Sequence, residues 1–516
     1  MIIYQVYPRS FSDANDDGIG DLAGIERKLP YIKSLGVDAV WISPFFKSPM
    51  KDFGYDVSDY RAVDPIFGTM DDFRSLMRRA KSLGLGIIVD MVISHTSEEH
   101  AWFKQSRARQ DDKSDWYLWA DPKPDGSPPN NWVSVFGGPA WRWDAERRQY
   151  YFHSFLSSQP DLNMHNPAVQ DAVLAEMDYW LDMGVAGFRF DACNHIFQDL
   201  QLRNNPPREH TGDALHPYGF QVHLYDQGRP EMLPFLERIR KLLDAYGAFS
   251  LAEVGGVDPL KLMGQYTQPG RLHSAYSFAL MRPDYSVDYV RKVIATLEEH
   301  LHPDSAACYA MSNHDKPRVA TRWQYGRDRD EAAKLHFALL LCMRGDICLY
   351  QGEELGLPQA EVPFERLQDP FGISFWPKFK GRDGCRTPMP WTGAAHGGFS
   401  TAEPWLPVVD EHIALNVERQ ETEADSMLRF AREMIALRKK TPALKNGCIA
   451  FVDAPDGVLA FVRDVNGEHV LCLFNLGDAP KKISGLTYDR MAFARHAQAD
   501  GNALTLGVCG FCLLQG

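Results

Sequence analysis

The stretch VAGFRFDA, residues 185–192, is an apolar strand that ends in charge, and it follows a helical pattern that stops at Gly184. That helix is expected over residues 167–183, and a glycine after a helix supplies the left-handed turn that ends it. The same unit occurs three more times, where helices stop at Gly36, Gly84 and Gly247 before VDAVWISP, GIIVDMV and AFSLAEV. Apolar strands that alternate with helices indicate a parallel sheet covered on both faces.

The number of strands favours a closed barrel over an open sheet. Four further strands, expected at residues 2–7, 274–278, 308–311 and 347–350, bring the count to eight. The fold class is therefore α/β, with an eightfold (β/α)8 TIM barrel.

Two segments interrupt the barrel pattern. A long stretch after the third strand, rich in Trp, Pro, Asp and Gly, indicates an inserted subdomain at residues 96–166. Alternating runs such as GVLAFVRDV and EHVLCLFNL indicate a C-terminal antiparallel β-sandwich at residues 447–516. The barrel then takes residues 1–95 and 167–446.

Composition excludes several classes of function. The 516 residues carry a net charge of -13 with no basic cluster, which argues against nucleic acid or an anionic membrane as a partner. No apolar run approaches the roughly 20 residues of a membrane span. The nine cysteines lack the spacing of a disulfide framework, and no secretory signal is visible, so we expect a cytoplasmic protein with reduced thiols.

Charged residues gather where the strands end, and in a barrel this is where active sites form. Arg189 and Asp191 are two apart on one strand, so both side chains point into the barrel mouth. A guanidinium beside a carboxylate favours its ionised form, as a nucleophile requires. Glu253 follows an apolar strand, a setting that suits a general acid. Two carboxyls in different environments are the parts needed for glycoside hydrolysis.

The segments DMVISH, GFRFDA, LAEV and MSNHD resemble, in this order, the four signature regions of glycoside hydrolase family 13, the α-amylase family, and QPDLN at residues 159–163 resembles its fifth. YQVYPRSF, YQGEELGL and GRDGCRTPMPW are similar to the α-glucosidase and oligo-1,6-glucosidase branch. The resemblance implies that Asp191 is the nucleophile, Glu253 the acid/base, and Asp315 the residue that binds the ring hydroxyls. It also implies contacts to the sugar or the nucleophile from Asp52, Tyr55, His95, Phe155, Arg189, His314 and Arg382.

The implied activity is that of a retaining, exo-acting α-glucosidase that releases α-glucose from short α-glucosides, with transglucosylation. In the family, a pair resembling Asp52 and Arg382 closes the pocket over the non-reducing end. A sucrose- or maltose-acting glucosyltransferase or isomerase is the main alternative, and a non-catalytic transporter-subunit relative is a remote one. Small α-glucosides are the expected partners, and the chain is expected to be a monomer or a homodimer.

Three positions depart from the pattern of true amylases. Ser94 replaces the asparagine that binds calcium between barrel and insertion in typical α-amylases, so a second calcium site is not expected. Asn194 replaces a lysine that contacts longer chains, so short substrates are expected rather than starch. Ala192, directly after the nucleophile, resembles the small residue of maltose-preferring members, where isomaltose-preferring members have valine. We therefore expect a preference for α-1,4 linkages.

The segment DANDDGIGD predicts a metal loop. Oxygen ligands alternate along it, with Gly18 where a calcium loop turns sharply, although Gly24 stands where a full EF-hand has glutamate. The loop resembles one that holds a structural Ca²⁺ or Mg²⁺ in this branch, and a metal-free Asn/Asp turn is the alternative. The predicted ligands are Asp13, Asn15, Asp17, Ile19 and Asp21.

Overall fold

The computed structural model describes residues 1–209 and 216–516 and contains the eight-stranded parallel barrel that the sequence predicts. The strands follow one another round the barrel in the order β11-β10-β9-β5-β2-β1-β13-β12. They are β1 (Ile2–Val6), β2 (Ala39–Ile42), β5 (Gly86–Met91), β9 (Gly187–Phe190), β10 (Phe249–Val254), β11 (Ser274–Ser277), β12 (Cys308–Tyr309) and β13 (Asp346–Tyr350).

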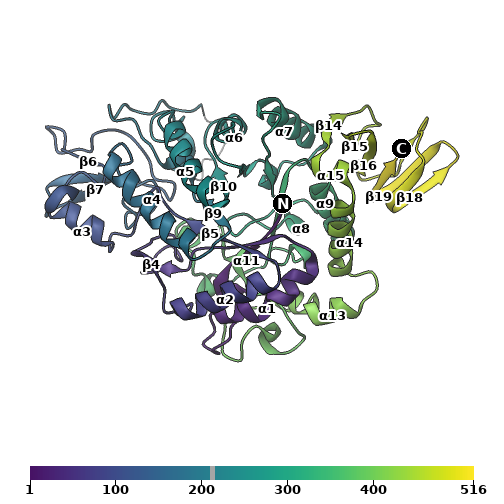
Figure 1. Cartoon of the computed structure of the whole chain (residues 1–516), viewed down its shortest axis with the longest axis horizontal. Helices are drawn as coiled ribbons and strands as arrows, with labels where there is room; N and C mark the ends of the chain where they lie inside the picture. Colours follow the sequence, from purple (N-terminus) through teal and green to yellow (C-terminus); the bar gives the residue numbers. More distant parts are fainter. Residues whose placement is uncertain (210–215) are drawn as a thin grey trace.

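Helices cover the outside of the barrel (Figure 1). Those on the outer layer are α1 (Leu22–Leu35), α2 (Met70–Ser82), α4 (Pro167–Asp182), α5 (Met232–Tyr246), α6 (Pro259–Tyr266), α7 (Val287–His300), α8 (Val319–Arg322) and α9 (Arg329–Leu341). Two of the glycines predicted to end helices do so: Gly36 and Gly247 adopt left-handed φ angles of 92° and 63° at the ends of α1 and α5. Neither angle suits a residue with a side chain, which is why glycine marks these ends.

Two long loops carry additional structure on the face where the barrel strands end. After β2 the chain forms a short hairpin, β3 (Phe46–Lys47) with β4 (Asp59–Val63). The inserted subdomain holds α3 (Ala101–Arg107) and a three-stranded sheet of β6 (Trp119–Ala120), β8 (Gln149–Phe152) and β7 (Trp141–Asp144). An isolated bridge between His95 and Asp161 joins the start and the end of this insertion, so it leaves and rejoins the barrel at one place.

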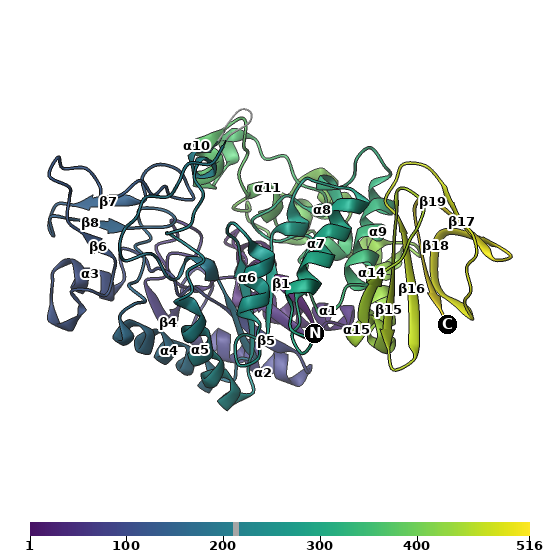
Figure 2. The ribbon, with the colours of Figure 1, turned by 90° about the horizontal axis from the view of Figure 1, so that it is seen from above.

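Five short helices and one of 14 residues, α14, lead from β13 to the last domain in the described part of the chain. They are α10 (Pro370–Phe375), α11 (Asp383–Arg386), α12 (Asp410–Ala414), α13 (Val417–Thr422), α14 (Met427–Lys440) and α15 (Pro442–Asn446). Figure 2 shows the inserted subdomain and the C-terminal strands at opposite ends of the long axis, with the barrel between them. None of the helices in the described ranges has the length and apolar composition of a membrane span.

The C-terminal domain differs in one respect from the predicted β-sandwich. Its strands are β14 (Cys448–Phe451), β15 (Val458–Val465), β16 (Glu468–Asn475), β17 (Lys481–Ile483), β18 (Arg490–Asp500) and β19 (Ala503–Gln515). They form one hydrogen-bonded antiparallel sheet instead of two, because the long β19 pairs with β16, β17 and β18 along its length. Register shifts interrupt the pairing of β18 with β19, and one face of the sheet buries a cluster that includes Leu473 and Leu504.

Candidate active site

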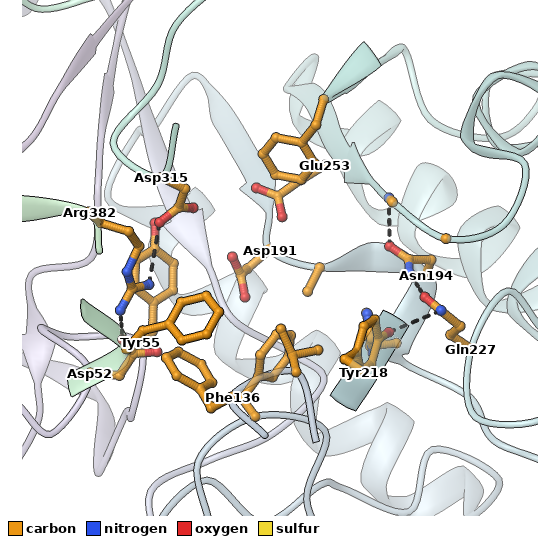
Figure 3. Close-up of a pocket in the computed structure, with 18 of the residues that line it drawn as sticks. Asp52, Tyr55, Phe136, Asp191, Asn194, Tyr218, Gln227, Glu253, Asp315 and Arg382 are labelled. Carbon is orange, nitrogen blue, oxygen red and sulfur yellow. Dashed lines mark hydrogen bonds and ion pairs between the residues drawn. The ribbon is translucent and has the colours of Figure 1, made fainter. Parts of the chain in front are cut away.

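A pocket opens where the barrel strands end, and most of the predicted site residues line it (Figure 3). Loops of the barrel, of the insertion and of the segment after β13 all contribute walls. Predicted residues on the wall are Asp52, Tyr55, His95, Phe155, Asp191, Glu253, Asp315 and Arg382.

Arg189 organises the two central carboxylates from behind the wall. On β9 its side chain is fully buried, and its Nη1 donates to Asp191 Oδ1 at 2.7 Å and to Asp90 Oδ1 at 2.8 Å. Its Nη2 contacts Glu253, on the neighbouring strand β10. One guanidinium therefore holds the predicted nucleophile and the predicted acid/base side by side, and both point into the pocket in Figure 3.

The electrostatics of Asp191 differ from the sequence expectation. Burial raises the pKa of Asp191 to about 7, and the nearby Asp90 and Asp315 carboxylates push the pKa in the same direction. Arg189 lowers it, as predicted, but does not outweigh the loss of water. The carboxyl is thus poised to change charge near neutral pH.

Asp315 has the opposite environment. Burial alone would raise its pKa, but His314, Arg382 and Arg386 together hold the pKa well below its usual range. Arg386 Nη2 donates to Asp315 Oδ1 at 2.8 Å, and Arg382 Nη1 lies 3.4 Å from the same oxygen. Asp315 is therefore a permanent anion facing the pocket.

Arg382 lines one end of the pocket, beside Asp52 and Asp315 (Figure 3). Its Nη2 donates to Asp52 Oδ1 and to Asp369 Oδ1, both at 2.8 Å, so the predicted pair of Asp52 and Arg382 is in contact. We call Asp52, Asp315, Asp369 and Arg382 the Arg382 ion cluster. It joins the loop after β2 to the segment between α10 and α11, two stretches far apart in the sequence.

Two of the predicted sugar contacts lie behind the wall instead of on it. His314 is fully buried, with Nδ1 at 2.7 Å from Gln5 Nε2 and Nε2 at 2.6 Å from the Tyr55 hydroxyl. The rings of His314 and Tyr55 stack with centroids 5.5 Å apart and planes 3° apart. Burial lowers the pKa of His314 to about 3, so its ring is neutral. His314 and Arg189 therefore support Tyr55 and the carboxylates.

His95 and Phe155 do reach the pocket. Burial lowers the pKa of His95 to about 4, and its Nδ1 lies 2.9 Å from Ser94 Oγ. Its Nε2 lies 3.0 Å from the Tyr55 carbonyl oxygen. The ring of Phe155 packs against His95, with centroids 5.2 Å apart, and supplies an apolar face.

The side of the pocket opposite the Arg382 ion cluster carries residues that the sequence did not single out for this role. Asn194 Oδ1 accepts from the backbone N–H of Gly255 at 2.8 Å, and its Nδ2 donates to Gln227 Oε1 at 2.5 Å. Gln227 Nε2 in turn donates to the Tyr218 hydroxyl at 3.1 Å. Figure 3 shows this chain of contacts to the right of Asp191. Ala192, directly after Asp191, also lines the pocket and has a left-handed φ of 42°.

The predicted metal loop is a turn held by its own backbone. Asp13 accepts from the N–H groups of Asn15, Asp16 and Gly18, and Asp21 caps α1 through Gly24. Across the described ranges, no group of three or more His, Cys, Asp and Glu side chains is arranged to hold a metal ion. The oxygens of Asp13, Asn15 and Asp17 are donors of the kind that Ca²⁺ and Mg²⁺ prefer, so the metal stays a prediction.

Comparison with known proteins places this site in a family. A model of the α-amylase catalytic domain matches residues 5–447. The chain is 51% identical over 489 residues to a probable α-glucosidase of Rhizobium meliloti (strain 1021), covering 92% of this chain and 89% of the relative. The crystal structure of the α-glucosyl transfer enzyme XgtA superposes with a TM-score of 0.96 at 51% identity, covering 100% of this chain and 98% of that one. A mutant form of a trehalulose synthase, MutB, superposes with a TM-score of 0.93 at 31% identity, covering 100% of this chain and 99% of that one.

The barrel and its carboxylate pocket define an enzyme of the glycoside hydrolase class. More specifically, the chain belongs to glycoside hydrolase family 13, the α-amylase family, and to the α-glucosidase branch of it. The family that the sequence motifs predict is therefore confirmed.

Proposed function

We propose that this enzyme is a retaining α-glucosidase that removes single glucose units from the non-reducing ends of short α-glucosides. The observation that carries the proposal is the shared contact of Asp191 and Glu253 with one guanidinium, that of Arg189. Retaining glycosidases have their two carboxyls about 5–5.5 Å apart, whereas inverting ones separate them by about 6.5–9.5 Å to admit a water. Two carboxyls on the two terminal nitrogens of one guanidinium fit the shorter spacing.

In the proposed reaction, Asp191 attacks the anomeric carbon while Glu253 gives its proton to the leaving oxygen. A covalent β-glucosyl ester on Asp191 results, and the carbohydrate leaving group departs with the proton. Glu253, now a carboxylate, then takes a proton from a water molecule whose oxygen attacks the anomeric carbon. The bond from this carbon to Asp191 breaks, which releases α-glucose and restores the Asp191 carboxylate and the protonated Glu253. Asp315, held as an anion by its arginines, stabilises positive charge that develops on the sugar ring.

The exo action follows from the closed end of the pocket. The Arg382 ion cluster, with Tyr55 beside it, occupies the end at which the chain of a longer glucan would continue beyond the non-reducing glucose. Only a terminal glucose then reaches Asp191. Support for short substrates also comes from Asn194. Its side chain is hydrogen-bonded to Gly255 and Gln227, and it is shorter than a lysine and carries no positive charge that could bind further glucose units.

A preference for maltose-type α-1,4 linkages is the finer part of the proposal, and it rests on Ala192. This residue lines the pocket directly after the nucleophile and has a left-handed backbone, which a β-branched residue adopts at a cost. Its methyl side chain takes up little of the pocket directly after the nucleophile.

Glucosyl transfer is the second candidate, because the covalent intermediate can react with a sugar instead of water. It is favoured by the similarity to XgtA, described as an α-glucosyl transfer enzyme, and to a trehalulose synthase. Both reactions would use the same three carboxylates.

The test is proton NMR of the enzyme with maltose, isomaltose and sucrose in separate samples, followed from the first minutes. Early α-glucose from maltose, with little from isomaltose, is the expected result. New glucosides or a sucrose isomer as main products would move the assignment to transfer or isomerisation. Faster cleavage of isomaltose than of maltose would contradict the linkage preference, and early β-glucose would contradict retention.

We also propose that the loop of Asp13, Asn15 and Asp17 binds a structural Ca²⁺ or Mg²⁺, on the strength of its oxygen donors. A cytoplasmic location is inferred in addition, since all nine cysteines are free thiols.

A further inference from the structure

Tyr276 is a buried residue beside the proposed acid/base that the reaction described above does not use. It lies on β11, where the parallel register pairs it directly with Glu253 of β10. Its side chain is 1% exposed, and its ring packs in the barrel interior near Trp41, with centroids 6.1 Å apart. Residues paired across parallel strands send their side chains to the same face, so both point into the barrel.

The hydrogen bonds of the Tyr276 hydroxyl have only one possible direction. Arg189 Nη2 lies 2.9 Å and Nε 3.3 Å from this oxygen, and a guanidinium can only donate. Burial raises the pKa of Tyr276 well above its ordinary value, so the hydroxyl keeps its proton. That proton is donated to Glu253 Oε2, at 2.9 Å.

We propose that Tyr276 is a positioning residue for the reaction, whose hydroxyl fixes the Glu253 carboxyl and favours its ionised form. The inference rests on the proposed function, in which Glu253 gives up a proton in the first step and accepts one in the second. Tyr276 and Arg189 both contact Oε2, which leaves Oε1 to face the leaving oxygen. A donor on the carboxylate makes release of the proton in the first step easier.

The same arrangement connects Glu253 to the charge of Asp191. Other charged or titratable groups face Arg189 and Tyr276 besides Glu253. They are Tyr55 of the loop after β2, Asp90 of β5, Asp191 and Cys193 after β9, His314 after β12 and Cys348 of β13. When Asp191 becomes an ester it loses its charge, and the Arg189 guanidinium is then shared by fewer anions. Tyr276, bonded to both Arg189 and Glu253, holds the carboxylate in place for its role as a base in the second step.

The experiment compares Tyr276→Phe with Tyr309→Phe as a matched control. Tyr309 is an equally buried tyrosine on the next strand, β12, whose hydroxyl lies 3.4 Å from Glu298, away from the pocket. The readout is kcat/KM against pH for maltose and for an aryl α-glucoside with a good leaving group, together with thermal unfolding of each variant.

Tyr276→Phe is expected to move the basic limb of the maltose profile to higher pH by about one to two pH units, because a hydrogen bond to a charged group is lost. At neutral pH its kcat/KM for maltose should fall about 10-fold to 100-fold, with a smaller fall for the aryl glucoside, whose departure needs little acid. Tyr309→Phe should keep the wild-type profile.

A second measurement does not depend on a cavity-forming change. With 3-fluorotyrosine at position 276, the hydroxyl is a stronger donor and the basic limb is expected to move to lower pH. The inference is overturned if the basic limb is unmoved in both forms, or if Tyr309→Phe shifts it equally. If the wild-type enzyme cleaves neither glucoside, it is the proposed function that fails.

Discussion

Asp191 is the residue on which turnover should depend most directly. Asp191→Asn is expected to lower kcat/KM for maltose by about 10⁴-fold or more, because no nucleophile remains. Folding should be intact, since the change removes one of three crowded anions, with Asp90 and Asp315 remaining. Activity assays and thermal unfolding of the purified variant check this, and substantial residual activity would show that the nucleophile is another residue.

The raised pKa of Asp191 predicts two pH effects. Activity requires the ionised nucleophile, so the acidic limb of kcat/KM should lie near pH 7 and not near the value of about 4 of an ordinary aspartate. Because the folded state binds this proton more tightly than the unfolded state, the contribution of Asp191 to stability is present at low pH and is lost as the pH rises from about 4 to 7.

Chemical unfolding at several pH values checks the second effect. The free energy of unfolding of the wild type should fall relative to that of Asp191→Asn across this interval. An equal pH dependence in both proteins would mean that Asp191 titrates normally in the folded state.

At the residue scale, the sequence predicted where the catalytic carboxylates lie better than it predicted their pKa values. Strand-end motifs placed Asp191, Glu253 and Asp315 in one pocket, because the carboxyl ends of barrel strands converge. The sequence shows that Arg189 is near Asp191, but it does not show how strongly burial removes water from the Asp191 carboxyl. The predicted direction of the pKa shift of Asp191 was therefore wrong. Tyr276 was missed because a tyrosine within an apolar strand has the pattern of a core residue.

At the element scale, the Arg382 ion cluster holds two loops together across one end of the pocket. Arg382→Ala would leave Asp52 and Asp369, both buried, without their cation. Removing one partner of a buried pair costs about 3–5 kcal/mol, and kcat/KM should fall at least about 100-fold as the closed end opens. Thermal unfolding and kinetics measure both effects.

The control for this change is Arg382→Lys, which keeps the charge but cannot bridge several carboxylates with one planar group. It should fall between the wild type and Arg382→Ala in both measurements. Wild-type kinetics in Arg382→Ala would remove the basis for a closed pocket and for exo action.

The loop at residues 13–21 is the element on which metal removal should act. If it binds Ca²⁺ or Mg²⁺, a chelator should lower the Tm by a few degrees, and adding the ion back should restore it. Asp17→Ala should abolish this response, whereas Asp125→Ala, in another exposed Asx turn, should keep it. An unchanged wild-type Tm with chelator would favour the metal-free turn.

Elements with a repeated pattern were predictable, and those with an irregular path were not. The helix expected to end at Gly247 and the strand after it match α5 and β10 closely. The strand expected at residues 308–311 is only the two-residue β12. The sequence shows that Gly24 replaces the glutamate of an EF-hand but not why. A Cβ at Gly24, in the first turn of α1, would lie 1.9 Å from the Ser12 carbonyl oxygen, so the close approach of the loop excludes a larger residue there.

At the scale of the whole molecule, a buried arginine, Arg463, connects the barrel to the C-terminal sheet. Arg463 of β15 donates to the carbonyl oxygens of Gly447, at 2.8 Å, and of Cys342, at the end of α9. Its Nε also donates to the carbonyl oxygen of Cys448, on β14, at 3.2 Å. These contacts satisfy carbonyl groups of both parts at once, so we expect barrel and sheet to unfold in one transition.

Arg463→Leu tests this connection, because it keeps most of the apolar volume and removes the donors. Two or more buried carbonyls would lose their partner, at a cost of about 1–3 kcal/mol each. The Tm should fall while kcat/KM at 25 °C stays unchanged, since Arg463 lies in the domain opposite the insertion (Figure 2) and does not line the pocket. Arg490→Leu, on the exposed strand β18, should change neither value. An earlier, separate melting of the C-terminal sheet, with activity retained above it, would show instead that the two parts are energetically independent.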